Sequence, residues 1–195
     1  AYNHNRDTTS SGVFVGGGVT NSQIVYNLID NVGGTGITTN TQFVAAPNTG
    51  LLIEKNHIRM TAFDGIRLNN TTDSFVLGNK SERNVRDGIR LQNSSHNNDV
   101  TNNLSRDNGR DGMRVDGPTS TPPSPQSMNN DIEQNKMVGN VEHDCHDDTV
   151  QEVAREVRLD DQLVVGHRRL GRQCERVLAE VRRLVLEAGD HDPVQ

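Results

Sequence analysis

A repeated motif constrains the fold of this chain more than any other feature of its sequence. The pentads DGIRL at 64–68, DGIRL at 87–91 and DGMRV at 111–115 are nearly identical. An asparagine stands nine residues before each pentad's glycine, and a β-branched residue stands three residues before that asparagine. The frame extends outward in both directions, so that six coils share one register from Asn3 to Asn135. The first constraint is therefore an internal repeat with insertions.

The residues that follow each glycine alternate between apolar and polar. Ile89 and Leu91, for example, flank Arg90. Such alternation is typical of a short strand with one buried face. A second apolar segment precedes each asparagine, as in GLLIEKN at 50–56. Two or three short strands in a repeat of this length leave no room for helix pairs, so we predict an all-β solenoid whose rungs pair in parallel, about 4.8 Å apart.

The repeated asparagines predict a structural ladder at one turn of the solenoid. Asparagine tolerates a left-handed backbone, and its side-chain amide can hydrogen-bond to the amide of the neighbouring coil. The residues expected to stack are Asn27, Asn56, Asn79, Asn103 and Asn135.

The composition suits a narrow core and argues against two classes of partner. Apolar residues make up 31% of the chain and aromatic residues 3%. That is lean for one wide core but sufficient for layers that each bury a few aliphatic side chains. The net charge of −6 predicts no nucleic-acid partner, which would require a basic surface. No run of residues approaches the ~20 apolar positions of a membrane span, so no membrane partner is predicted.

The pattern [IV]xxN followed by DG[IM]R resembles the coils of the right-handed parallel β-helix family with pectate-lyase-like repeats, over roughly residues 1–148. Members include pectate lyases, mannuronan C5-epimerases, periplasmic copper-site accessory proteins and uncharacterised bacterial secreted proteins. The resemblance implies a right-handed solenoid of about six coils, a secreted or periplasmic location and a polysaccharide partner. The segment HDCHDD at 143–148 is similar to the last coil of some uncharacterised secreted bacterial members, in which a further coil and a closing cysteine follow.

The domain organisation changes at two points. Residues 117–127 are rich in proline and predict a surface loop, either a plain excursion or a lip over a binding groove. Residues 149–195 contain no Asn, Ser, Lys, Phe or Tyr, yet eight Arg. Val177, Val181 and Leu184 have helical spacing, so one interpretation is an α-helical cap over the end of the solenoid. The other is non-native sequence from a shifted reading frame, and the sequence does not separate the two.

Two rows of charged residues are the candidate substrate-binding positions. The outward row comprises Arg67, Arg90 and Arg114, and the row before each glycine comprises Asp64, Asp87 and Asp111. In one interpretation the two rows lie at the surface and neutralise each other. In the other they face an acidic polysaccharide, because arginine binds carboxylates through paired donors and the aspartates could hold Ca²⁺.

No catalytic residue and no metal site is predicted. Lyases and epimerases need a base for the C5 proton and positive charge for the resulting anion, and no residue matches their signatures. The cluster at 143–148 contains metal-ligand types, but alternation along a strand would point Cys145 inward and His146 outward. Its spacing fits no standard zinc pattern, and a buried or disulfide-bonded cysteine is predicted instead. Apart from the Ca²⁺ option, no cofactor is expected.

The function expected from these features is an extracellular carbohydrate-interacting β-helix, related to polysaccharide lyases or C5-epimerases. The alternative is a non-catalytic structural or adhesion module. A third option, an accessory role in metal-cofactor maturation, rests on family analogy alone. Whether the chain is an enzyme, and how it oligomerises, are left open by the sequence.

Overall fold

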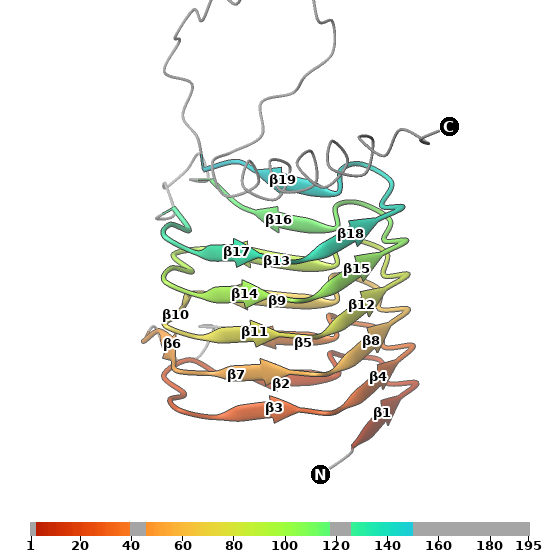
Figure 1. Ribbon diagram of the computed structural model, residues 1–195. Helices are drawn as coiled ribbons and strands as arrows, with labels where there is room; N and C mark the ends of the chain where they lie inside the picture. Colours follow the sequence, from red (N-terminus) through yellow and green to blue (C-terminus); the bar gives the residue numbers. More distant parts are fainter. Residues whose placement is uncertain (1–2, 40–45, 118–125, 150–195) are drawn as a thin grey trace, which may run out of the picture.

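The chain forms a solenoid of short parallel strands. A computed structural model describes residues 3–39, 46–117 and 126–149. Within these ranges all strand pairings are parallel, and strands and turns occur without a helix (Figure 1). The predicted all-β parallel solenoid is therefore confirmed. Residues 118–125 of the insertion and 150–195 of the tail lie outside the described residues, so their interpretations stay predictions.

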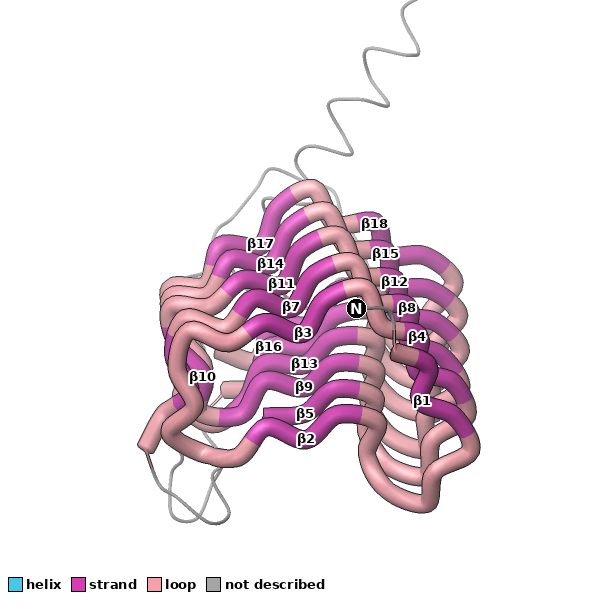
Figure 2. Tube along the Cα trace, turned by 90° about the horizontal axis from the view of Figure 1, so that it is seen from below, coloured by secondary structure: helices cyan, strands magenta, loops and turns pink. Residues whose placement is uncertain are grey.

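Each full coil passes through three long sheets, here called D, A and B in chain order (Figure 2). Sheet D comprises β3 (Gln23–Val25), β7 (Leu52–Glu54), β11 (Phe75–Leu77), β14 (Asp99–Thr101) and β17 (Asp131–Glu133). Sheet A comprises β1 (His4–Arg6), β4 (Leu28–Asp30), β8 (His57–Arg59), β12 (Lys80–Glu82), β15 (Leu104–Arg106) and β18 (Lys136–Val138). Sheet B comprises β2 (Val13–Val15), β5 (Ile37–Thr39), β9 (Ile66–Asn69), β13 (Ile89–Gln92), β16 (Met113–Val115) and β19 (Cys145–Asp147). A short sheet C pairs β6 (Asn48–Thr49) with β10 (Thr71–Thr72).

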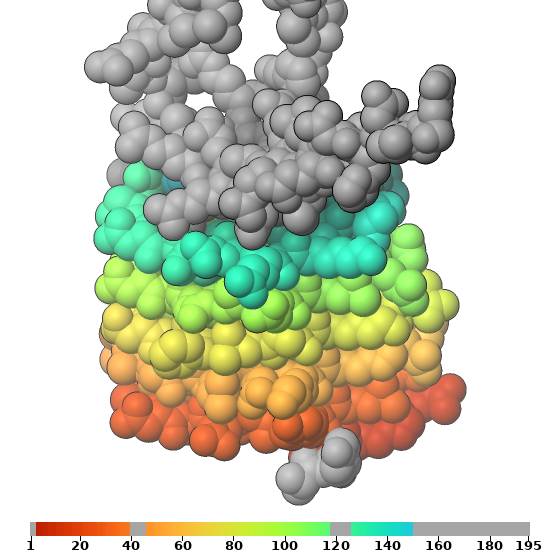
Figure 3. Space-filling model, viewed as in Figure 1, coloured from red at the N-terminus to blue at the C-terminus, as the bar shows by residue number. Residues whose placement is uncertain are grey.

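The register between coils is the one predicted from the repeat. In sheet B, Ile89 lies opposite Ile66 on one side and Met113 on the other. Sheets A and B each contain six strands, which matches the six coils. Successive coils appear as successive bands of colour in the space-filling view (Figure 3). Equivalent residues of neighbouring coils therefore stack directly on one another.

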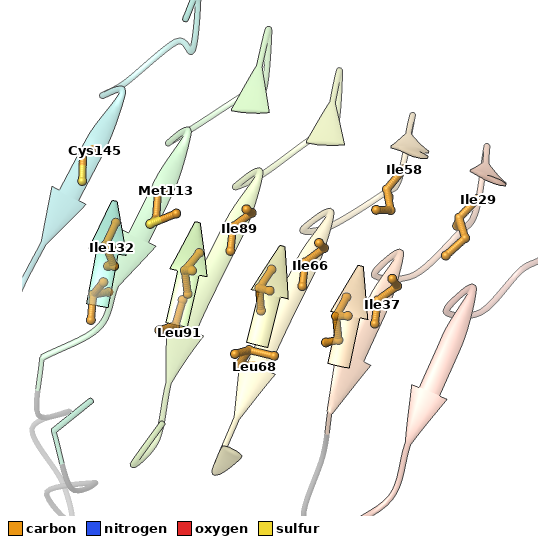
Figure 4. Packing of buried hydrophobic residues seen from close by; sticks show 14 of the residues in the cluster. Ile29, Ile37, Ile58, Ile66, Leu68, Ile89, Leu91, Met113, Ile132 and Cys145 are labelled. Atoms are coloured by element: carbon orange, nitrogen blue, oxygen red, sulfur yellow. The ribbon is translucent and has the colours of Figure 1, made fainter. Parts of the chain in front are cut away.

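The core is a narrow column of aliphatic side chains (Figure 4). In sheet B two residues of each strand point inward, and in sheets D and A the middle residue does. The inward positions predicted from the pentads are all fully buried, namely Ile66, Leu68, Ile89, Leu91, Met113 and Val115. Because each layer contributes only a few such side chains, an apolar content of 31% is enough.

An asparagine ladder lies at the turn between sheets D and A. Asn79 Nδ2 donates to Asn103 Oδ1 at 3.0 Å, and the same oxygen accepts the backbone N–H of Asn79 at 2.9 Å. Asn79 Nδ2 also donates to the carbonyl oxygen of Ile53, in the preceding coil, at 2.8 Å. Side-chain amide bonds of this kind join the whole predicted set, Asn27, Asn56, Asn79, Asn103 and Asn135. The ladder is confirmed, and it satisfies backbone and side-chain donors that would otherwise be buried without a partner.

The prediction of a left-handed backbone at these asparagines is wrong, because the left-handed residue is the one before each of them. Positive φ angles occur at the residue before each ladder asparagine, for example 51° at Lys55, 60° at Gly78 and 57° at Asn102. The preceding residue makes the tight turn. The asparagine itself keeps an ordinary backbone, so its N–H can point along the solenoid axis to the next asparagine.

Two further asparagine ladders occupy the other two corners of the coil. Asn84 and Asn108 are joined by an amide bond of 2.9 Å at the turn between sheets A and B, and Asn140 continues that row. Asn98 and Asn130 are joined by a bond of 3.0 Å at the turn between sheets B and D. The sequence did not reveal them because neither ladder runs through all the coils.

The glycine of each pentad is required by the close approach of neighbouring coils. A β-carbon on Gly88 would collide with Ser105 Oγ and would lie 2.6 Å from the carbonyl oxygen of Gly112. Ser105 Oγ donates to that same carbonyl oxygen at 2.6 Å. Only glycine leaves room for this contact at the turn between sheets A and B.

The ladder at the turn between sheets D and A makes a first prediction. Asn79→Ala should lower the free energy of unfolding by about 1–3 kcal/mol, because it leaves buried partners unpaired. The matched control is Asn69→Ala, since the Asn69 side chain accepts one partly buried hydrogen bond from Asn93. Urea unfolding of both variants measures the difference. Equal and small losses in the two variants would contradict the structural role of the ladder.

Candidate functional site

The outer faces of the three long sheets differ in charge. In sheet A the outward strand positions carry more cations than carboxylates, with Arg6, Arg59, Lys80, Arg106 and Lys136 against Asp30 and Glu82. In sheet D the charged outward strand positions are all acidic, namely Glu54, Asp99, Asp131 and Glu133. Although the net charge of the chain is −6, the outer face of sheet A is basic and adjoins the acidic outer face of sheet D (Figure 2).

Sheet B carries the arginine row predicted from the sequence. Arg90 lies opposite Arg67 and Arg114 in the register of the sheet. The three side chains point outward but are only 26%, 18% and 17% exposed along the row. The predicted orientation is confirmed, and the limited exposure indicates that other groups cover the guanidinium groups.

The aspartate row beside it was predicted to lie at the surface, and this prediction is wrong. Asp64, Asp87 and Asp111 are fully buried. Asp64 Oδ1 accepts the backbone N–H of Asp87 at 3.3 Å, and Asp87 Oδ1 accepts that of Asp111 at 3.2 Å. The carboxylates turn into the corner of the coil to satisfy these donors, so they form a buried ladder beneath the arginines.

Two additional carboxylates complete the ion pairs on sheet B. Arg90 donates to Asp116 through Nε at 3.0 Å and Nη2 at 2.7 Å. Arg114 donates to Asp116 at 2.8 Å and to Asp148 at 2.6 Å. Five aspartates thus surround three arginines on this face. These contacts favour mutual neutralisation over an acidic polymer at this site, and substrate binding by the row stays a prediction.

Burial perturbs one member of the aspartate row. Loss of hydration raises the pKa of Asp87, and the nearby Asp64 carboxylate raises it further, to about 6. The Oδ2 atoms of both residues lack a hydrogen-bond partner among the described residues. Arg90 approaches Asp87 no closer than 3.9 Å, which is too far for a strong compensating bond.

A cluster on sheet A, centred on Glu82, escaped the sequence analysis. Glu82 is 1% exposed, and its Oε1 lies 2.8 Å from His57 Nε2 and 2.9 Å from Lys80 Nζ. Arg106 Nε donates to its Oε2 at 2.6 Å, and Arg83 Nη2 lies 3.8 Å from Oε1. Three cations, Lys80, Arg83 and Arg106, and the imidazole of His57 therefore converge on one carboxylate.

The electrostatics of this cluster leave positive charge at the surface. Burial acts to raise the pKa of Glu82, but hydrogen bonds from Lys80, His57 and Arg106 outweigh it and hold the pKa at about 2. Glu82 is thus ionised at any physiological pH. The outer parts of Lys80, Arg83 and Arg106 remain 37%, 53% and 42% exposed. Tabulating the outward positions of the strand after each ladder asparagine would have revealed the cluster.

The last described coil departs from the repeat. His143 and His146 occupy the positions held by aspartate and arginine in the three preceding coils. Both ring Nδ1 atoms face Asp111 of the coil below, at 2.8 Å and 3.1 Å. Cys145 points inward at 7% exposure and is not a free thiol, whereas His146 points outward, so the predicted alternation is confirmed.

Comparison with known families identifies the fold. A family model described as a right handed beta helix region matches residues 1–151. The comparisons with curated proteins and with solved structures found no match. Over the ranges that the structure describes, no helix has the length and apolarity needed to cross a membrane.

The raised pKa of Asp87 makes a second prediction. A carboxyl group whose pKa is higher in the folded chain than its ordinary 3.8 destabilises the fold once it ionises. The contribution of Asp87 to stability should therefore fall as the pH rises from about 4 to about 6 and stay level above that. Asp87→Asn should remove this fall and be more stable than wild type at pH 7, by on the order of 2–3 kcal/mol at most.

Urea unfolding of wild type and variant across this pH range measures the effect. The control is Asp116→Asn, whose carboxylate binds Arg90 and Arg114 and whose loss should destabilise the protein at pH 7. Parallel pH profiles for wild type and Asp87→Asn would contradict the assignment.

Proposed function

We propose that this chain, which belongs to the right-handed β-helix family, binds an acidic polysaccharide along the outer face of sheet A. The observation that carries the proposal is the surplus of exposed cationic side chains around Glu82. Such a partner implies a secreted or periplasmic location, which is part of the proposal.

The arrangement of the cations suits an extended polymer. Lys80 lies between His57 and Leu104 in the sheet register, and Lys136 follows Leu104 one coil further on. Lys80 and Lys136 are thus two rungs apart, about 10 Å along the axis. A chain of uronic acids presents carboxylates at regular intervals along its length, so a repeated row of cations can engage several of them at once.

Glu82 prepares this surface for binding. Its carboxylate pairs with Lys80 at 2.9 Å and with Arg106 at 2.6 Å, while both side chains stay partly exposed. Side chains that are ordered before binding lose less conformational entropy when the ligand arrives. Arg106 binds Glu82 through Nε, which leaves guanidinium donors for a ligand carboxylate.

The acidic face beside it restricts where the polymer can bind. The outward carboxylates of sheet D would repel an anionic chain, as would the excess of aspartates on sheet B. Carboxylates on sheets D and B, which have the same sign of charge as the polymer, would restrict its binding to sheet A. Sheet A is the face on which an acidic polymer meets net attraction.

The second candidate function is a non-catalytic structural or adhesion scaffold. The observation that favours it is the mutual neutralisation of charges on sheet B, where each arginine of the row is occupied by carboxylates. A solenoid that serves as a spacer needs such internally satisfied faces and no ligand. The two candidates differ in whether sheet A has a partner.

Binding to defined polymers tests the proposal. Wild type should bind polygalacturonate and alginate but not neutral dextran in affinity electrophoresis. Its affinity should fall as salt is added, because exposed charges are screened over ~8–10 Å. Lys80→Gln combined with Arg83→Gln should weaken binding by about 2- to 30-fold, given ~0.2–1 kcal/mol for each exposed pair.

The matched control is Arg67→Gln combined with Arg90→Gln on sheet B, which removes the same charge and should leave binding unchanged. Loss of binding in the sheet B variant alone would move the site to the arginine row predicted from the sequence. Failure of wild type to bind either acidic polymer would overturn the proposal in favour of the scaffold.

A further inference from the structure

The end of sheet B breaks the pattern that the rest of the row follows. In three coils an aspartate at the corner is followed, three residues later, by an outward arginine. In the last described coil both positions are histidine, His143 and His146. Stacking places His143 above Asp111 and His146 above Arg114. In this coil two imidazole side chains beside the buried Asp111 carboxylate therefore replace the aspartate–arginine ion pair of the earlier coils.

These three side chains converge on one point. His143 Nδ1 lies 2.8 Å from Asp111 Oδ1, and His146 Nδ1 lies 3.1 Å from Asp111 Oδ2. The imidazole rings are 4.7 Å apart between centroids. One ligand atom from each side chain can be chosen so that all lie within 4.8 Å of one another. Asp111 is fully buried, whereas each histidine is about one quarter exposed.

A fourth residue orients one of the histidines. His146 Nε2 lies 2.8 Å from Asp148 Oδ1, on the side of the ring away from Asp111. Histidines that bind metals usually donate the other ring N–H to a carboxylate, which fixes the tautomer and makes the binding nitrogen a better ligand. His146 has this arrangement, with Nδ1 toward the cluster and Nε2 toward Asp148.

The local charge also favours a cation. Asp111, Asp116 and Asp148 surround the cluster, and Arg114 is the cation that pairs with all three. Arg90 also pairs with Asp116. With neutral histidines, the three aspartates and two arginines carry a net charge of about −1, which favours a divalent ion. Arg114 Nη1 lies 3.3 Å from Asp111 Oδ2 and 3.3 Å from His146 Nδ1, so an ion would displace it from both atoms. Bonds of 2.8 Å and 2.6 Å to the other two aspartates would hold the arginine side chain when the ion enters.

We infer that Asp111, His143 and His146 form a Zn²⁺-binding site at the C-terminal end of sheet B. Zinc takes imidazole and carboxylate ligands at about 2.0–2.2 Å in a tetrahedral arrangement. Ligand atoms of such a site are separated by roughly 3.3 Å, so the observed separations require only small side-chain rotations. Nitrogen ligands favour zinc over Ca²⁺, which takes oxygen ligands. Three protein ligands leave a fourth position for water or another ligand.

The inference is independent of polymer binding on sheet A, and Zn²⁺ alone tests it. Metal-free full-length chain should bind zinc in calorimetry and gain several degrees in melting temperature when zinc is added. His143→Gln combined with His146→Gln should lose both effects. The matched control, His57→Gln combined with His96→Gln, removes two histidines elsewhere on the solenoid and should keep them. Far-UV circular dichroism checks that both variants fold.

Asp148→Asn gives a second test that leaves all three ligands in place. It should weaken zinc binding by about 10- to 100-fold, the range found for carboxylates that orient metal-binding histidines. The inference is overturned if wild type fails to bind zinc. It is also overturned if the folded His143→Gln/His146→Gln variant binds zinc with the stoichiometry and affinity of wild type.

Discussion

The hydrogen bonds of one side-chain oxygen underlie the rest of this structure. Each interior ladder asparagine accepts, at its Oδ1, both the side-chain and the backbone N–H of the equivalent residue in the preceding coil. Its own Nδ2 returns a bond to a carbonyl oxygen of that preceding coil. A shift of one residue would break all three bonds and bury their partners unpaired, at a cost of ~1–3 kcal/mol for each group. Strands of only three residues can therefore pair in one register.

Because of that register, a residue type repeated at one position of the coil forms a row along the solenoid. At the corner before sheet B, aspartate repeated over three coils becomes a buried ladder, and the arginine three residues later becomes a covered row. Histidine at the same two positions in the next coil becomes a candidate metal site. On sheet A, a buried glutamate on one coil binds a histidine of the preceding coil and an arginine of the next coil. The chemistry of this chain lies in departures from the repeat and in alternation between coils.

The sequence predicted what every coil repeats. Ile89 and Leu91 point inward and Asn79 joins a ladder because each has equivalents in the coils above and below. Other features depend on contacts between coils that the spacing of residues in the sequence does not predict. Asp87 resembles a surface turn residue in sequence, and its burial follows from a backbone N–H in the next coil. Asp111 meets His143 across 32 residues that include the proline-rich insertion, so the cluster at 143–148 gave no hint of its third member.

Hydrogen exchange at the ladder tests the central claim most directly. The backbone N–H groups of Asn56, Asn79 and Asn103 lie at turns, where amides usually exchange quickly, yet each donates to the side-chain oxygen of the next ladder asparagine at 2.9 Å. NMR-detected exchange should find them as slow as the strand amide of Ile89, which opens only when the solenoid unfolds. Exchange at the rate of ordinary exposed turns would show that the asparagines do not hold the coils in register.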